Sequence, residues 1–241
     1  MGDHRARTLI GFFPTQLAAI STTLLLFCAT VPLACAPGGR LEETRASEVV
    51  GRLGGRTARD TGRYGEPIGK VDLAGKPVTD ADLNALSGFA HLYDLVLLRT
   101  QITDAGLEHL KKTGKLRVLN LDETRVTDAG LVQLGALTSL RALYLARTDI
   151  TDAGLESLRS LTKLRELGLC GTSLTDAGLV HIHELTDLRV LDLRETHVTD
   201  SGLAPLKLLT RLQKLCLRGT AVSVAGAQEL QRALPNARVL R

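Results

Sequence analysis

The leucines of this chain recur every 24 residues, and this period constrains the fold more than any other feature of the sequence. An aliphatic residue occupies the same position in seven consecutive units, without an insertion: Val71, Leu95, Leu119, Leu143, Leu167, Leu191 and Leu215. A second aliphatic residue follows each of these anchors by two positions. Because one unit cannot bury its own apolar side chains, successive units must stack against one another.

Each unit follows the pattern L-x-x-L-x-L-x-x-T-x-[VI]-T-D-A-G-L-x-x-L-x-x-L. The L-x-L stretch has a period of two, which predicts a short strand with both leucines on one face. The later leucines stand three apart, which predicts a helix or a tighter 3₁₀ segment. Since 44% of the residues are hydrophobic but only 3% are aromatic, the predicted core is built from aliphatic side chains.

This pattern resembles the leucine-rich repeat, with Thr where that family most often has Asn or Cys. It is most similar to the ribonuclease-inhibitor-like branch, whose T-D-x-G-L repeats occur in exported bacterial proteins and in F-box receptor tails. The resemblance implies an α/β fold: a right-handed solenoid of seven repeats with terminal caps, a curved parallel sheet inside and helices outside. It also implies a protein-binding scaffold. No F-box-like segment precedes Val71, which argues against a ubiquitin-ligase role.

Two polar positions repeat as regularly as the leucines. A threonine such as Thr100 follows the predicted strand in six of the seven units, where we expect its hydroxyl to bond the backbone of the next coil. A Thr-Asp pair such as Thr103-Asp104 precedes each helical run, where either side chain can cap free N–H groups. Capping explains these aspartates better than a calcium ladder, since each coil supplies one carboxylate. A glycine such as Gly130 is expected to let adjacent helices approach closely.

Residues 1–36 are typical of an export leader. Residues 8–39 carry no charge, and an apolar run over residues 17–27 follows Arg5 and Arg7. Leu33-Ala34-Cys35 resembles a bacterial lipoprotein box and predicts lipidation of Cys35, although Pro32 stands where that family usually has Leu.

Two alternatives to the lipoprotein remain open. The first is simple cleavage after Ala36, which Pro37 would obstruct because of its fixed φ and missing N–H. The second is an uncleaved signal anchor, because residues 17–36 are about long enough to cross a bilayer. All three alternatives place the rest of the chain outside the cytoplasm, in the cell envelope or as a secreted or periplasmic protein, with membrane contact only through this N-terminal segment.

The mature chain is expected to contain a tether and N-terminal cap at residues 37–70, the solenoid at 71–220, and a degenerate last repeat with a C-terminal cap at 221–241. Leu41, Val49, Val50 and Leu53 have helical spacing that Gly54-Gly55 ends, and residues 56–70 are expected to add a strand. The last unit loses its Thr-Asp pair. Atypical end units shield the open apolar ends of a solenoid.

The sequence offers no constellation that predicts catalysis. It lacks the common metalloprotease, thiol-redox, hydrolase and phosphate-loop patterns. His181 and His183 lie two apart, so on a helix they face different sides and make a poor metal site. The formal charge of +4 comes from interspersed signs, which predicts no nucleic-acid partner. We therefore expect no enzyme, cofactor or metal, and free thiols at Cys170 and Cys216.

The outward residues of the strands form the predicted binding surface, on the concave face. Early coils contribute apolar side chains and one tyrosine, whereas late coils contribute cations. The residues expected to contact a protein partner are Val96, Leu98, Asn120, Asp122, Tyr144, Arg194, Lys214 and Arg218. Aromatic and Arg side chains are enriched in binding hot spots. We expect a monomeric scaffold.

Alternative functions are an envelope polysaccharide-binding or enzymatic solenoid and a purely structural envelope protein. Sugar binding on the concave face is disfavoured because Tyr144 is the only aromatic residue predicted there.

Overall fold

The computed structural model describes residues 39–241. The leader and its candidate lipidation site, Cys35, lie outside these described residues. Within residues 39–241, no helix combines the length and the apolar character needed to span a membrane.

Short strands alternate with short helical segments along residues 39–241. In chain order these elements, in which η marks a 3₁₀ helix, are α1 (Gly39–Arg52), β1 (Arg56–Arg59), β2 (Ile68–Asp72), η1 (Asp80–Gly88), β3 (Asp94–Val96), α2 (Asp104–Leu110), β4 (Val118–Asn120), α3 (Asp128–Leu134), β5 (Ala142–Tyr144), α4 (Asp152–Leu155), η2 (Glu156–Leu158), β6 (Glu166–Gly168), η3 (Gly178–Glu184), β7 (Val190–Asp192), η4 (Asp200–Leu203), η5 (Pro205–Leu208), β8 (Lys214–Cys216), α5 (Val224–Ala233) and β9 (Arg238–Leu240).

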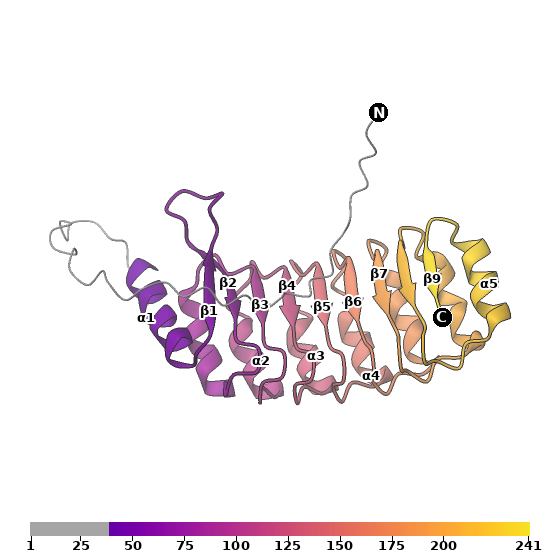
Figure 1. Ribbon diagram of the computed structural model, residues 1–241, viewed down its shortest axis with the longest axis horizontal. Helices are drawn as coiled ribbons and strands as arrows, with labels where there is room; N and C mark the ends of the chain where they lie inside the picture. Colours follow the sequence, from indigo (N-terminus) through magenta and orange to yellow (C-terminus); the bar gives the residue numbers. More distant parts are fainter. Residues whose placement is uncertain (1–38) are drawn as a thin grey trace, which may run out of the picture. The chain divides into compact units, whose positions relative to one another are not determined.

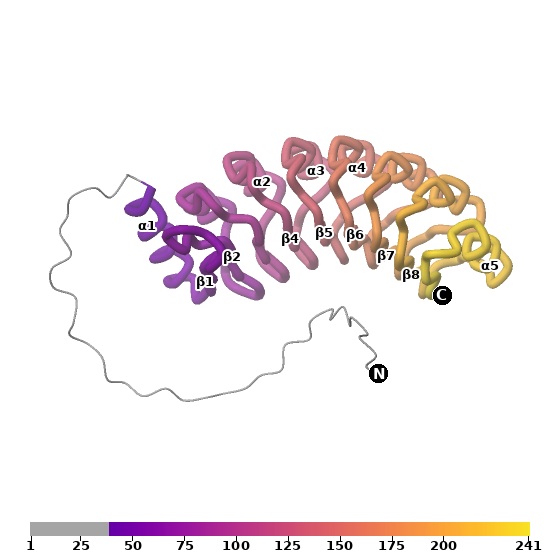
Figure 2. Tube along the Cα trace, turned by 90° about the horizontal axis from the view of Figure 1, so that it is seen from above, coloured from indigo at the N-terminus to yellow at the C-terminus, as the bar shows by residue number. Residues whose placement is uncertain are grey.

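The strands form one sheet in chain order, β1 to β9. From β2 to β9 all neighbours pair in parallel, and each anchor leucine pairs with the anchor of the next coil, as Leu95 does with Leu119. The helical segments line the opposite side (Figure 1). Residues 39–241 form an arc with the strands on its inner side (Figure 2). The expected α/β solenoid with a parallel sheet is confirmed.

The leucines predicted to face inward are buried. Leu95, Leu119, Leu143 and Leu145 are all 0% exposed and belong to one continuous core cluster. The helical segments include both α and 3₁₀ forms, as the leucine spacing allowed. Full burial of each leucine contributes about 1.5–3 kcal/mol, so neighbouring coils supply most of the stability.

The repeated aspartates join successive coils, a role that sequence reasoning missed. Thr103 caps its own helix, accepting a hydrogen bond from the Ala105 N–H at 3.4 Å. The carboxylate of Asp104 instead accepts from Thr127 in the next coil, from the backbone N–H at 2.8 Å and from the hydroxyl at 2.7 Å. The same pair of bonds recurs from Asp80 to Asp200 along the described coils. Both oxygens of these carboxylates are therefore engaged.

The expected partner of the threonine after each strand was wrong. The Thr100 hydroxyl donates to the Leu97 carbonyl at 2.7 Å, within its own coil rather than to the next one, because the strand has just ended and leaves that carbonyl free. Gly130 lets α3 approach α2 closely, as expected, because its missing Cβ leaves room for side chains of α2. A Cβ at Gly130 would lie 2.3 Å from Asp104 Oδ1.

Both ends of the sheet carry extra elements. At the N-terminal end, α1 contributes the buried Ala46 and Val50 to the core, and β1 pairs antiparallel to β2. At the C-terminal end, α5 is followed by β9, which pairs in parallel with β8. Gln231 ties these two elements together, since its amide accepts from the Val239 N–H at 3.1 Å and donates to the Ala237 carbonyl at 2.6 Å.

Candidate functional site: the concave sheet face

The outward side chains of the strands form parallel rows, because successive strands pair without a register shift from β2 to β9. The middle row contains Asp72, Val96, Asn120, Tyr144, Gly168, Asp192, Cys216 and Leu240. Same-row residues of adjacent strands lie ~4.8 Å apart, so neighbouring side chains contact each other. All eight predicted site residues lie on this face or at its strand ends.

Tyr144 is a fixed aromatic side chain near the middle of the sheet. Its hydroxyl donates to Glu166 Oε2 at 2.5 Å, and its ring lies above Gly168, where an added Cβ would be 3.1 Å from Tyr144 Cδ1. Burial, followed by the hydrogen bond to Glu166, raises the pKa of Tyr144. Tyr144 is therefore a neutral, preoriented ring rather than an ionisable group at neutral pH.

Asn120 and Asp122 hold the strand end beside Tyr144. The Asn120 side chain accepts from the Asp122 N–H at 2.8 Å, and Asp122 Oδ1 accepts from the Ala146 N–H at 2.6 Å. Burial raises the pKa of Asp122, although the hydrogen bond from Ala146 opposes this shift. These two polar residues therefore fix the turn of one coil against the next.

The apolar side chains of the early coils form a half-buried strip rather than an exposed apolar patch. Val96, Leu98 and Ala146 are half-buried, and Ala142 is buried. The close row spacing explains this, because each side chain is covered by its neighbours in adjacent strands. The exposed large apolar residues of the described chain lie elsewhere: Leu41, Tyr64, Val132, Val180, Leu208 and Val224.

The cations of the late coils are not equivalent. The Arg194 guanidinium makes a bidentate pair with Asp192, through contacts of 2.9 and 2.7 Å, and this hydrogen bonding raises the pKa of Arg194. Arg218 and Lys214 make no ion pair with another residue in the 39–241 region. Arg218 and Lys214, with Arg238 beside Lys214 on β9, therefore carry the available positive charge at the late coils of this face.

Cys170 and Cys216 are free thiols that lie almost buried in the same region, each 9% exposed. Desolvation by burial raises the pKa of both thiols, which keeps them protonated. Within the described residues, no cluster of His, Cys, Asp and Glu is suited to hold a metal ion. His181 and His183 both lie in η3 and are half-buried.

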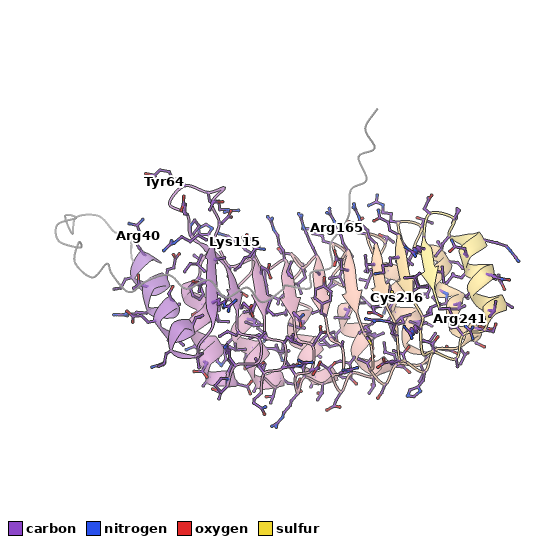
Figure 3. The ribbon with its side chains drawn as sticks, in the orientation of Figure 1. Arg40, Tyr64, Lys115, Arg165, Cys216 and Arg241 are labelled. Atoms are coloured by element: carbon purple, nitrogen blue, oxygen red, sulfur yellow. The ribbon has the colours of Figure 1, made fainter. Side chains whose placement is uncertain are left out.

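Sequence reasoning missed a row of arginines at the edge where the strands begin. Two residues before the anchor, four successive coils carry Arg117, Arg141, Arg165 and Arg189. Charges appear interspersed along the chain, but the 24-residue period places these four side by side. Figure 3 shows Lys115 and Arg165 along this edge. The signal was present as an arginine repeat in register with the leucines.

A pocket of about 530 Å³ adjoins the N-terminal end of this arginine row. It lies between the β1–β2 loop and the starts of the next strands. Its lining residues are Asp60, Arg63, His91, Tyr93, Lys115, Arg117 and Ser139. Tyr93 is thus a second aromatic residue near the sheet, outside the strand positions that the repeat pattern marks.

Comparisons with known proteins agree with this architecture. A family model described as Leucine Rich repeat matches residues 136–158 and 184–207. A search of curated proteins gives no significant match.

Solved structures of two internalins from Listeria monocytogenes are similar to this chain. Internalin C2 (inlC2) superposes with a TM-score of 0.55 at 18% identity, covering 83% of this chain and 90% of that chain. An internalin (inlF) superposes with a TM-score of 0.54 at 21% identity, covering 66% of this chain but only 50% of that chain. The chain therefore spans about half the length of the second internalin, and both likenesses show a shared fold. Together with the family match and the regular register of buried leucines, they show that the chain contains leucine-rich repeats and has the leucine-rich-repeat fold.

Proposed function

We propose that this protein is a non-catalytic scaffold of the cell envelope or exterior that binds a protein partner on its concave sheet face. The leucine-rich repeat fold suits protein interaction, because stacked coils present a long, rigid and nearly continuous surface. The leader-like sequence pattern of residues 1–36 supports the location.

The observation that carries the proposal is the fixed position of Tyr144. Its hydroxyl is bound to Glu166 and its ring lies over Gly168, so little side-chain freedom remains to be lost on binding. A rigid aromatic side chain flanked by half-buried apolar residues, with Arg218 three strands further along the same face, has the composition of an interface hot spot. We infer that Arg218 and Lys214 orient the partner, since Arg194 is already neutralised by Asp192.

Quantitative affinity capture from the native cell envelope tests this proposal. The wild type, Tyr144→Ala and Lys214→Glu/Arg218→Glu are compared with Val132→Ser, a control at an exposed residue of helix α3. We expect one specific protein to be retained by the wild type and the control and depleted roughly tenfold or more with both concave variants. Equal capture by all four proteins would contradict the concave site.

The proposed location is tested separately. Cys35→Ala removes the thiol that would carry the lipid, so it is expected to abolish metabolic labelling of the protein with a fatty acid. A product that fractionates with the cytoplasm in the wild type would refute export.

A further inference from the structure

We infer that the edge of the sheet where the strands begin is a second binding site, which takes a linear acidic polysaccharide. This site is separate from the concave face and does not depend on the protein-binding proposal. It consists of the arginine row (Arg117, Arg141, Arg165 and Arg189), the neighbouring Lys115 and Lys163, and the pocket at the N-terminal end of the row.

The backbone holds the arginine row in register. The Arg141 N–H donates to the Arg117 carbonyl at 2.7 Å, the Arg165 N–H to the Arg141 carbonyl at 2.7 Å, and the Arg189 N–H to the Arg165 carbonyl at 2.8 Å. Adjacent strands stand ~4.8 Å apart, so the row presents guanidinium groups at a regular, short interval along one line. This regularity matches a polymer that carries an anion on each successive unit.

These cations have no acidic partner within residues 39–241. None of the four arginines, nor Lys115 or Lys163, forms an ion pair there. The opposite edge of the sheet differs, because Arg99 and Arg147 both pair with Glu123. Unit charges 4 Å apart in water repel by about 1 kcal/mol, so a row of unpaired cations favours a polyanion that relieves this repulsion.

The pocket extends the row with groups suited to a sugar. All its lining side chains are polar or ionisable, and they include the Ser139 hydroxyl, the His91 imidazole and the Tyr93 ring. Arg63 fixes one wall, because it pairs with Asp60 at 3.0 Å and contacts His91 Nδ1 at 3.2 Å. A carbohydrate ring stacks on an aromatic face while its hydroxyl groups bond to such polar neighbours. Guanidinium groups bind carboxylate or phosphate in a fork geometry.

Other polyanions fit this edge less well. The β1–β2 loop projects beyond the edge at its N-terminal end, which would keep a flat membrane away from the neighbouring arginines (Figure 1). Single-stranded nucleic acid is usually bound on a series of stacked aromatic side chains along the strand, whereas the arginine row has none and the pocket has the Tyr93 ring and the His91 imidazole. A flexible acidic chain can follow the row and place one sugar in the pocket.

The test measures the affinity of the full chain for polygalacturonate, with neutral dextran, oligo-deoxythymidine and phosphatidylglycerol vesicles as comparison ligands. The row variant replaces Arg117, Arg141, Arg165 and Arg189 with Gln. The matched control removes the same charge elsewhere, at Lys111, Lys112, Arg125 and Arg232. Because the row's backbone hydrogen bonds do not involve the side chains, the row variant is expected to fold, which circular dichroism checks.

We expect polygalacturonate to bind the wild type and the control equally, and the row variant roughly tenfold or more weakly, with the wild-type affinity falling as salt is added. Tyr93→Leu should also weaken binding several-fold, whereas Tyr144→Ala should leave it unchanged. The site would be overturned if dextran bound as tightly as polygalacturonate. It would also be overturned if the charge-matched control lost as much affinity for polygalacturonate as the row variant does. Tighter binding of the oligonucleotide or of the vesicles would overturn the ligand class.

Discussion

The carboxylate of Asp128 accepts two hydrogen bonds from Thr151 in the following coil, from its backbone N–H at 2.8 Å and from its hydroxyl at 2.6 Å. Thr151 in turn accepts from the Ala153 N–H at 3.3 Å and so begins its own helix. One repeated dipeptide therefore starts a helix and also attaches the coil to its neighbour. This double role explains why Thr and Asp recur together in these units.

Asp128→Ala should lower the free energy of unfolding by about 1–2 kcal/mol, since it removes both hydrogen bonds to Thr151. The free energy of unfolding of Asp128→Asn should fall between those of the wild type and Asp128→Ala, because the Asn amide retains a single acceptor oxygen. Thr151→Ser serves as a control that keeps the hydroxyl. Urea unfolding midpoints measure the series, and an unaltered midpoint for Asp128→Ala would contradict the coil-to-coil role.

Leu145→Ala should cost about 2–5 kcal/mol, because Leu145 is fully buried with packed coils on both sides and its loss leaves a cavity. Thr148→Ala should cost about 1 kcal/mol, for one hydrogen bond to the Leu145 carbonyl. Urea midpoints for the two variants check the ranking. The reverse order would mean that core and turn positions are exchanged.

Gly130→Ala should destabilise the protein, although Ala is ordinarily better than Gly inside a helix by ~1 kcal/mol. The new Cβ would lie 2.3 Å from Asp104 Oδ1 and 2.9 Å from Leu107 Cδ1, so the link between coils must shift, at a cost of about 1–3 kcal/mol. Gly51→Ala in α1 is the matched control, since nothing lies within 4 Å of its added Cβ. Thermal melts should move in opposite directions for the two variants, and a rise for both would refute the close contact.

Asp122→Asn should stabilise the protein at pH 7. Burial raises the pKa of Asp122, so the ionised carboxylate is less favourable in the folded chain than in the unfolded chain. This cost is present at neutral pH and disappears as the pH falls below the unfolded pKa of about 4. Asn keeps the acceptor for the Ala146 N–H without the charge. Urea midpoints of the two proteins should therefore converge between pH 7 and pH 4; a difference that stays constant would exclude this cause.

The core was predictable from the sequence because a strand places alternate residues on one face and the 24-residue period repeats that placement. Leu119 and Leu143 are therefore buried and paired as expected. The partner of Asp104 was not predictable by the same reasoning. Helix capping suggests a partner within the next few residues, whereas the true partner, Thr127, lies 23 residues ahead.

In the candidate sites too, the repeat predicts where a residue lies but not which residue of the neighbouring coil it contacts. Tyr144 was placed on the concave face by its position in the repeat, but its bond to Glu166 depends on the neighbouring strand. The arginine row was missed because charge was judged along the chain, where Arg117 and Arg141 stand far apart. Stacking brings them to adjacent strands. Contacts between coils are thus the part of this structure that local sequence patterns do not reveal.

Site-specific photocrosslinking in the cells that make the protein tests the central claim most directly. A photoreactive phenylalanine analogue replaces Asn120 on the concave face or, as a control, Val132 on the exposed side of α3. The proposal predicts one discrete protein adduct from position 120 that is lost when Tyr144→Ala is added, and none from position 132. An adduct from position 132 with none from position 120 would contradict a binding site on the concave sheet.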